Sequence, residues 1–127
     1  MNKAEWDALN TSEKNILVAK NVMGLTVFEF EPGTNSRLFC AVPPEEIDNP
    51  EYFDEFLKRY TTNRNACALV LDEIYAMGPE TEEAFGDKIR GIHFGSKDVR
   101  WGSRIAETRI LRLSPDLICY CAIKAIE

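Results

Sequence analysis

The chain has 127 residues and a mass of 14.5 kDa, a length typical of one domain that buries roughly two thirds of its unfolded surface. Hydrophobic residues make up 45% and charged residues 28%, which is a globular rather than a disordered composition. No run of about 18 apolar residues is present to cross a membrane, and residues 1–7 lack the apolar core of a secretory signal. We therefore expect a folded protein that stays in the cytoplasm.

The formal net charge of -6 is unevenly distributed along the chain. Residues 88–112 hold seven basic and two acidic side chains, a net +5, which leaves -11 on the other 102 residues. An acidic body repels a long polyanion at a distance, whereas a compact basic segment can still hold a phosphate at short range. The sequence thus argues against duplex nucleic acid as a partner and favours a small anionic ligand.

The four cysteines form no Cys-x-x-Cys pair, and the single histidine, His93, is distant from all of them in sequence. Zinc sites need closely spaced ligands, so we predict no metal and no cofactor. In a cytosolic protein, unpaired cysteines are usually small buried hydrophobes, and we expect this of all four. They are Cys40, Cys67, Cys119 and Cys121.

The N-terminal third predicts a helix and a hairpin. Apolar residues at helical spacing favour a helix over 12–23, with Thr11 or Ser12 as its cap. Gly24 follows where a left-handed residue would end the helix. Alternating residues on either side of a Pro-Gly-containing turn predict a β-hairpin over 25–42.

The middle of the chain predicts two helices, 50–60 and 65–76. Pro50 occupies the tolerated first position of the former. The latter is expected to turn its apolar side chains inward and to end at Met77-Gly78-Pro79; these side chains are Ala66, Leu69, Val70 and Ile74. The acidic residues after it show no apolar periodicity, so we interpret them as a solvated linker or helix turn. They are Glu80, Glu82, Glu83 and Asp87.

The C-terminal third predicts strands over 88–94 and 99–113, the second broken near Trp101-Gly102-Ser103. Ser114-Pro115-Asp116 supplies a cap, a first-position proline and a first-turn acid for a helix over 115–126. The expected fold is a single α+β domain over 1–127, a small antiparallel sheet layered with helices in the manner of an α-β-α sandwich.

Three segments resemble a known family of small phage proteins. Ile16 to Gly24 resembles the family's "LVAEKVMG" opening, and Tyr60-Thr61-Thr62-Asn63 resembles its "YSTD" stretch. Asp116 to Ala122 is similar to its closing "ICRAAL" helix, with Tyr120 where the family has Arg. These motifs belong to proteins with the phage α-β-α sandwich domain, and the resemblance implies that fold and a phage origin.

The middle of the chain departs from that pattern. Residues 43–57 and 80–87 are longer than in the ordinary family, and Leu25-Thr26-Val27-Phe28 replaces its aromatic residues after the first glycine. These departures resemble the anti-defence sponge proteins of the Thoeris system. That resemblance implies a non-catalytic homo-oligomer that binds cyclic ADP-ribose isomers, made by bacterial TIR enzymes, at subunit boundaries. Some of these sponges also hold cyclic oligonucleotides.

The basic segment supplies the candidate ligand contacts. A guanidinium donates two parallel hydrogen bonds to a phosphate, and an aromatic ring can stack on a base. We predict these roles for Arg90, Phe94, Arg100, Trp101, Arg104 and Arg109. The alternative is that the two rings are ordinary core residues and that the arginines form a solvated face paired with the acidic body.

No constellation in the sequence signals an enzyme. A Gly-x-Ser-x-Gly elbow and a Cys–His motif are both absent, and the adjacent Asp72-Glu73 carboxylates point in different directions from a helix. The aromatic side chains over 52–60 favour core packing, and a subunit interface or a lid over a ligand is the alternative. The leading hypothesis is sequestration of a cyclic nucleotide without cleavage. The alternative is a phage accessory protein whose basic strand docks on a protein partner, with no small ligand.

Overall fold

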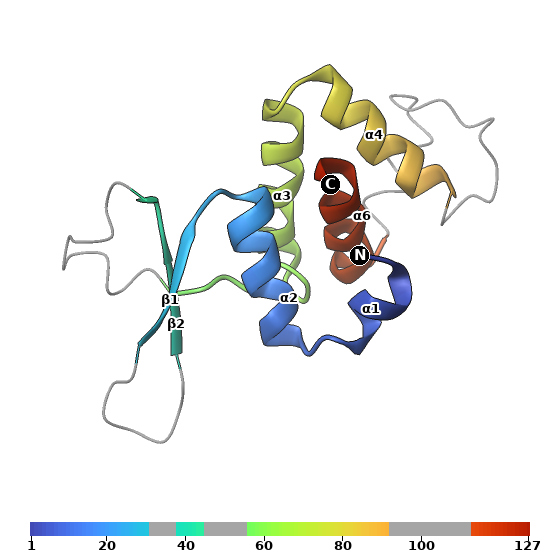
Figure 1. Cartoon of the computed structure of the whole chain (residues 1–127). Coiled ribbons are helices and arrows are strands. Elements are labelled where there is room, and N and C mark those ends of the chain that lie inside the picture. Colours follow the sequence, from blue (N-terminus) through green and yellow to red (C-terminus); the bar gives the residue numbers. More distant parts are fainter. Residues whose placement is uncertain (31–37, 45–55, 92–112) are drawn as a thin grey trace.

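A computed structural model describes residues 1–30, 38–44, 56–91 and 113–127 (Figure 1). These ranges hold five helices and a two-stranded antiparallel sheet, which confirms a small α+β domain. None of the described helices is long and apolar enough to span a bilayer. The elements are α1 (Lys3–Ala8), α2 (Thr11–Leu17) with its π-helical continuation η1 (Val18–Val22), β1 (Thr26–Phe30), β2 (Leu38–Val42), α3 (Arg64–Ala76), α4 (Pro79–Ile89) and α6 (Pro115–Ile126).

The first helix, α1, was not predicted because only one large apolar side chain marks it. Asn2 caps this helix by accepting a 2.8 Å hydrogen bond from the Glu5 amide. Trp6 is completely buried. A six-residue helix is unstable alone, so burial of this indole holds α1 in place.

The cap of α2 differs from the expected Thr11 or Ser12. Asn10 caps the helix, and its side chain and that of Glu13 each accept a hydrogen bond from the other residue's amide, at 2.8 and 3.1 Å. Thr11 is already the first helical residue. Asparagine is as good a cap as serine, and the glutamate three residues later completes a capping box that only Asn10 can form.

The expected helix over 12–23 is present as α2 followed by η1. The wide turn is closed by a 3.0 Å hydrogen bond from the Met23 amide to the Val18 carbonyl. Gly24 then adopts a φ of +67°, as predicted, and the chain turns into β1. The π-helical turn places Val18, Ala19 and Val22 in the core.

The predicted hairpin is confirmed over β1 and β2. Its register runs from Thr26 opposite Val42 to Phe30 opposite Leu38. The turn at 31–37 lies outside the described residues. Figure 1 shows the hairpin beside α2, with the described helices on one side of it.

The helix expected over 50–60 is wrong over residues 56–60; residues 50–55 lie outside the described ranges. Phe56 forms an antiparallel bridge with Cys40, and the Leu57 amide donates a 2.8 Å hydrogen bond to the Phe39 carbonyl. Tyr60 is buried at the start of a turn. The same apolar spacing that fits a helix also suits a chain lying along β2, whose edge groups need backbone partners.

Helix α3 confirms the expected helix over 65–76 and starts one residue earlier, behind its Asn63 cap. Its core-facing residues are Cys67, Val70 and Ile74. Leu69, expected to point inward, is 38% exposed. The inner face is therefore rotated toward Cys67, a side chain that behaves as a small hydrophobe.

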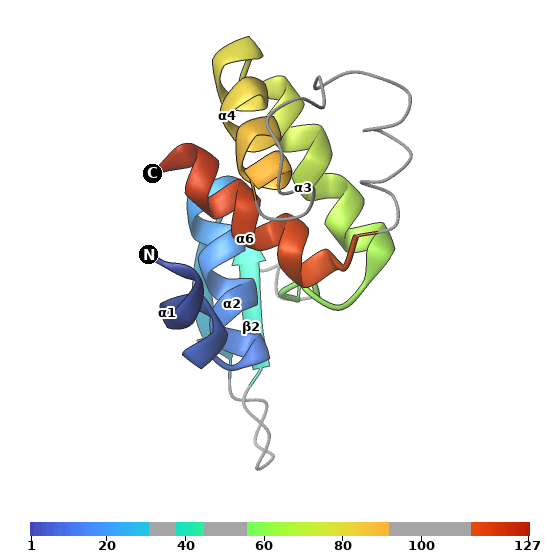
Figure 2. The same ribbon diagram turned by 90° about the vertical axis from the view of Figure 1, so that its right-hand side faces the viewer.

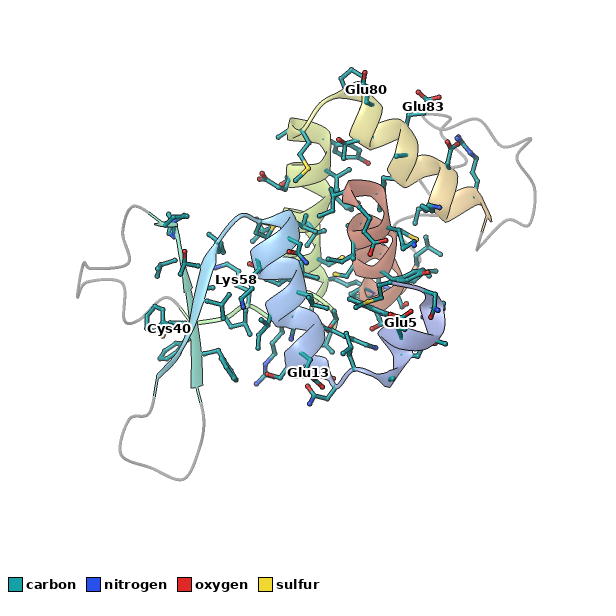
Figure 3. The ribbon with its side chains drawn as sticks, in the orientation of Figure 1. Glu5, Glu13, Cys40, Lys58, Glu80 and Glu83 are labelled. Atoms are coloured by element: carbon teal, nitrogen blue, oxygen red, sulfur yellow. The ribbon has the colours of Figure 1, made fainter. Side chains whose placement is uncertain are left out.

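The acidic stretch after α3 is a full helix, α4, rather than a linker. Gly78 turns the chain with a φ of +112°, and Pro79 occupies the first helical position. Glu80 and Glu82 lie in the first turn, where negative charge is favourable, and Glu80 and Glu83 point outward (Figure 3). Phe85 and Ile89, one turn apart, are both completely buried and attach the helix to the core.

The strand expected over 88–94 is wrong over its described part. Residues 88 and 89 complete α4, and residues 90 and 91 continue in a π-helical turn. The buried pair Phe85 and Ile89, four residues apart, sets a helical period there. Residues 92–94 and the strand predicted over 99–113 lie outside the described residues, apart from Leu113, which sits in a bend.

The last helix, α6, has the bounds that the sequence predicts and forms the centre of the core. The Ser114 hydroxyl caps it by accepting a 3.2 Å hydrogen bond from the Leu117 amide. It packs against α3, α4 and η1, and Figures 1 and 2 show it between its neighbours. The Tyr120 ring also contacts that of Trp6, with centroids 5.9 Å apart. Residues 118–123 are all buried.

Candidate functional site

The structure describes one of the six predicted ligand contacts, Arg90. The other five lie outside the described residues. They are Phe94, Arg100, Trp101, Arg104 and Arg109. Within the described ranges, the candidate site therefore consists of the two points at which residues 92–112 join the helical body.

The first junction is the end of α4. Arg90 is its C-terminal cap residue, and its side chain is 11% exposed. Its guanidinium pairs with the Asp87 carboxylate one turn earlier. A cation is also favoured here by the partial negative charge of the helix C-terminus. A phosphate would have to compete with the Asp87 carboxylate for the Arg90 guanidinium. Arg90 therefore anchors this junction more than it offers an unoccupied contact to a ligand.

The second junction is Leu113, which is buried at 4% exposure immediately before the cap of α6. Its carbonyl accepts a 3.2 Å hydrogen bond from Nη1 of Arg64, the first residue of α3. This arginine was not singled out in the sequence because it lies outside the basic segment. Its contact ties the end of that segment to both α3 and α6.

A separate charged cluster lies where α1 meets α6. The Asp116 carboxylate pairs with Lys14 at 2.8 Å and accepts a 3.3 Å hydrogen bond from the Trp6 indole. The Lys14 and Lys3 ammonium groups also lie 5.2 and 5.3 Å from the ring centroids of Trp6 and Tyr120. These mutual contacts satisfy the charges and fasten α1 to the core, so we assign the cluster a structural role.

A surface hollow of about 360 Å³ lies beside the two chain ends. Its lining residues are Asn21, Ile123, Ile126 and Glu127. The Glu127 carboxylate pairs with the Met1 amine at 2.9 Å and with Lys124 at 3.0 Å. Hydrogen bonds from the amine and then from Lys124 hold the pKa of Glu127 below its usual range. Because the Glu127 carboxylate is already paired with both the Met1 amine and Lys124, the residues that line the hollow offer no acid–base pair for catalysis.

The four cysteines are buried, as expected from the sequence. Burial raises the pKa of the Cys121 thiol to about 12, and that of the Tyr60 phenol likewise to about 12. Both groups are therefore protonated and unreactive at neutral pH. Among residues that the structure describes, no group of three His, Cys, Asp or Glu side chains could hold a metal ion.

No family model matches the chain, and neither a curated protein nor a solved structure matches it. All three segments on which the resemblance to phage proteins rests lie within the described residues. Residues 16–24 form the end of α2, η1 and the Gly24 turn; residues 60–63 lead into α3; residues 116–122 lie in α6. They shape the core and its turns.

Proposed function

We propose that the protein binds a small phosphate-bearing nucleotide, of the cyclic ADP-ribose class, and sequesters it without cleavage as a phage anti-defence protein. The observation that carries this proposal is the charge distribution: residues 88–112 hold +5 while the rest of the chain holds -11. So dense a basic segment on an acidic protein needs an anionic partner more than it serves solubility.

The helical body gives this basic segment a firm base. Arg90 at one junction is held by Asp87, and Leu113 at the other is held by Arg64. The arginines between the junctions would bind the phosphates, and Phe94 or Trp101 would stack on the base.

The resemblance to the Thoeris sponge proteins supports the choice of ligand and the anti-defence role. It also supports a homo-oligomer with the ligand at a subunit boundary and, as a second ligand class, cyclic oligonucleotides. The acidic body, which includes the outward-pointing Glu80 and Glu83 (Figure 3), supports a short ligand over duplex nucleic acid.

The test is to incubate the purified protein with cyclic ADP-ribose isomers and measure its thermal unfolding. A ligand at 100 times its dissociation constant adds about 2.7 kcal/mol of stability. Heating the complex should then release the intact nucleotide, which mass spectrometry identifies. Absence of any shift, or return of a breakdown product alone, contradicts sequestration.

Matched variants locate the binding site. Replacing Arg100, Arg104 and Arg109 together with alanine should abolish the shift. The control is replacement of Lys58 and Arg59, exposed basic residues outside the segment, which should leave it unchanged. Equal loss in both variants would show that binding follows overall charge and not the basic segment.

One observation favours the competing function, docking on a protein partner. Leu69, Tyr75 and Met77 are large apolar side chains at 38–43% exposure on and just after α3. Such residues are common at protein interfaces. A host protein captured by the chain, together with no shift from any cyclic nucleotide, would support this function over the first.

A further inference from the structure

Two buried thiols lie where α3 packs against α6. Cys67 is the fourth residue of α3 and Cys119 the fifth of α6, and the two helices lie side by side in Figures 1 and 2. The Cys67 sulfur lies 3.9 Å from the carbonyl oxygen of Pro115, one turn before Cys119. The Cys119 sulfur lies 3.4 Å from the carbonyl oxygen of Tyr60, in the turn that leads to α3. The Cys67 sulfur thus lies near the helix that carries Cys119. The Cys119 sulfur lies near the turn that leads into the helix that carries Cys67.

The surroundings of the two thiols make them unequal. A hydrogen bond between them lowers the pKa of Cys67, and the positive charge of Arg64 lowers it further, against the effect of burial. The same hydrogen bond and burial raise the pKa of Cys119. Cys67 also lies near the N-terminus of α3, where the helix favours a thiolate. These surroundings favour Cys67 over Cys119 as the nucleophile of the pair.

The other buried thiols have different neighbours. The charged groups that act on Cys121 are Lys3 and Lys88, on α1 and α4 rather than on α3. Cys40 lies on β2, where it bridges to Phe56. Both are as deeply buried as Cys119, so they serve as matched controls for it.

We propose that Cys67 and Cys119 form a redox-active dithiol, which a peroxide converts into a disulfide that joins α3 to α6. The Cys67 thiolate sulfur attacks one oxygen of hydrogen peroxide, the O–O bond breaks, and hydroxide leaves. The Cys119 sulfur then attacks the resulting sulfenic acid, the S–S bond forms, and the hydroxyl group leaves as water with the Cys119 proton. In total, two thiols lose two hydrogens and one peroxide becomes two waters.

The bond would lie at the base of the basic segment. Arg64, which holds the Leu113 carbonyl, is three residues before Cys67, and Leu113 is six before Cys119. Oxidation would therefore fix the second junction covalently and raise the thermal stability of the fold.

The experiment treats the full chain, reduced and under native conditions, with hydrogen peroxide. We expect the number of thiols titrated after denaturation to fall from four to two. Peptide mapping without reductant should show one crosslink, between the peptides of Cys67 and Cys119, and the melting temperature should rise. Dithiothreitol should reverse all three changes.

Variants then assign the bond. Cys67→Ala and Cys119→Ala should each abolish the crosslink, whereas Cys40→Ala and Cys121→Ala should retain it. The peptide map of the unaltered protein does not depend on whether a variant folds. Four free thiols after treatment, a crosslink between other cysteines, or a crosslink formed only in denaturant would each overturn the proposal.

Discussion

The substitution Asn15→Ala, in the middle of α2, tests whether the loss of a buried hydrogen-bonded contact outweighs the gain in helix propensity. The Asn15 side chain is 5% exposed, and its Oδ1 atom accepts two hydrogen bonds from Thr61, from the amide at 3.1 Å and from the hydroxyl at 2.9 Å. Thr61 is itself only 4% exposed. The contact links α2 to the turn before α3, across 46 residues of sequence.

The two effects have opposite signs. On helix propensity alone, alanine is better than asparagine by about 0.6 kcal/mol, so the variant would be stabilised. The structure predicts the reverse, because the substitution leaves a buried amide and a buried hydroxyl without their acceptor. Each such loss costs about 1–3 kcal/mol. After the gain in propensity, we expect a net destabilisation of about 1.5–5 kcal/mol.

Urea unfolding followed by far-ultraviolet circular dichroism measures this difference. Thr61→Val should cost only about 1 kcal/mol, since the Thr61 amide keeps its acceptor, and the double variant should show non-additive costs. Asn65→Ala, on an exposed position of α3, is the control and should change stability by less than about 0.7 kcal/mol. An Asn15→Ala protein as stable as the unaltered chain, or more so, would refute the assigned role of this contact.

Three further measurements test the rest of the fold. Gly78→Ala should lower stability by about 1–2 kcal/mol although no atom lies within 4 Å of the added methyl group, because a φ of +112° strains any other residue; calorimetry that finds no change would contradict this. Burial raises the pKa of Tyr60 from 10.0 to about 12, so the folded state keeps a proton that the unfolded chain releases. The stability from this phenol is therefore complete below pH 10 and is lost as the pH rises toward 12. Urea titrations at several pH values should show a shallower decline for Tyr60→Phe, and an identical decline would argue against the buried phenol. Val70→Ala should cost about 2 kcal/mol and Leu69→Gln less than about 0.5 kcal/mol in urea unfolding, and equal costs would restore the inward Leu69 that the sequence suggested.

The elements that the sequence predicts well are those with strong local signals. Ser114, Pro115 and Asp116 mark the start of α6 through capping, ring geometry and first-turn charge, all within three residues. Gly24 likewise ends the segment of α2 and η1 with the left-handed conformation that glycine adopts easily. Such signals act between chain neighbours, so they survive without knowledge of the packing.

The elements that were wrong depend on contacts distant in sequence. Phe56 lies against β2 because Cys40 and Phe39 offer backbone partners, and no local pattern reveals that edge. The helix α4 is anchored by Phe85 and Ile89, whose burial against α6 outweighs an otherwise polar surface. Tertiary packing therefore overrode the local interpretation in both places.

Of the predicted ligand contacts, the described residues include only Arg90, whose role in binding stays a prediction. It lies at the end of α4, where the sequence predicted a strand. Its pairing with Asp87 depends on the helix, which brings side chains three residues apart together; a strand would have separated them. The support that Arg64 gives to Leu113 required the packing of α3 on α6 and had no signal in the sequence.

The central position of α6 has a consequence for synthesis of the chain. Ribosomes release a protein from its N-terminus, so α1 to α4 leave the exit tunnel before the helix around which they pack. Until residues 115–126 emerge, the apolar faces of α3, α4 and η1 lack their shared neighbour. The core therefore assembles only after residues 115–126 have emerged, and until then the nascent chain exposes those apolar faces.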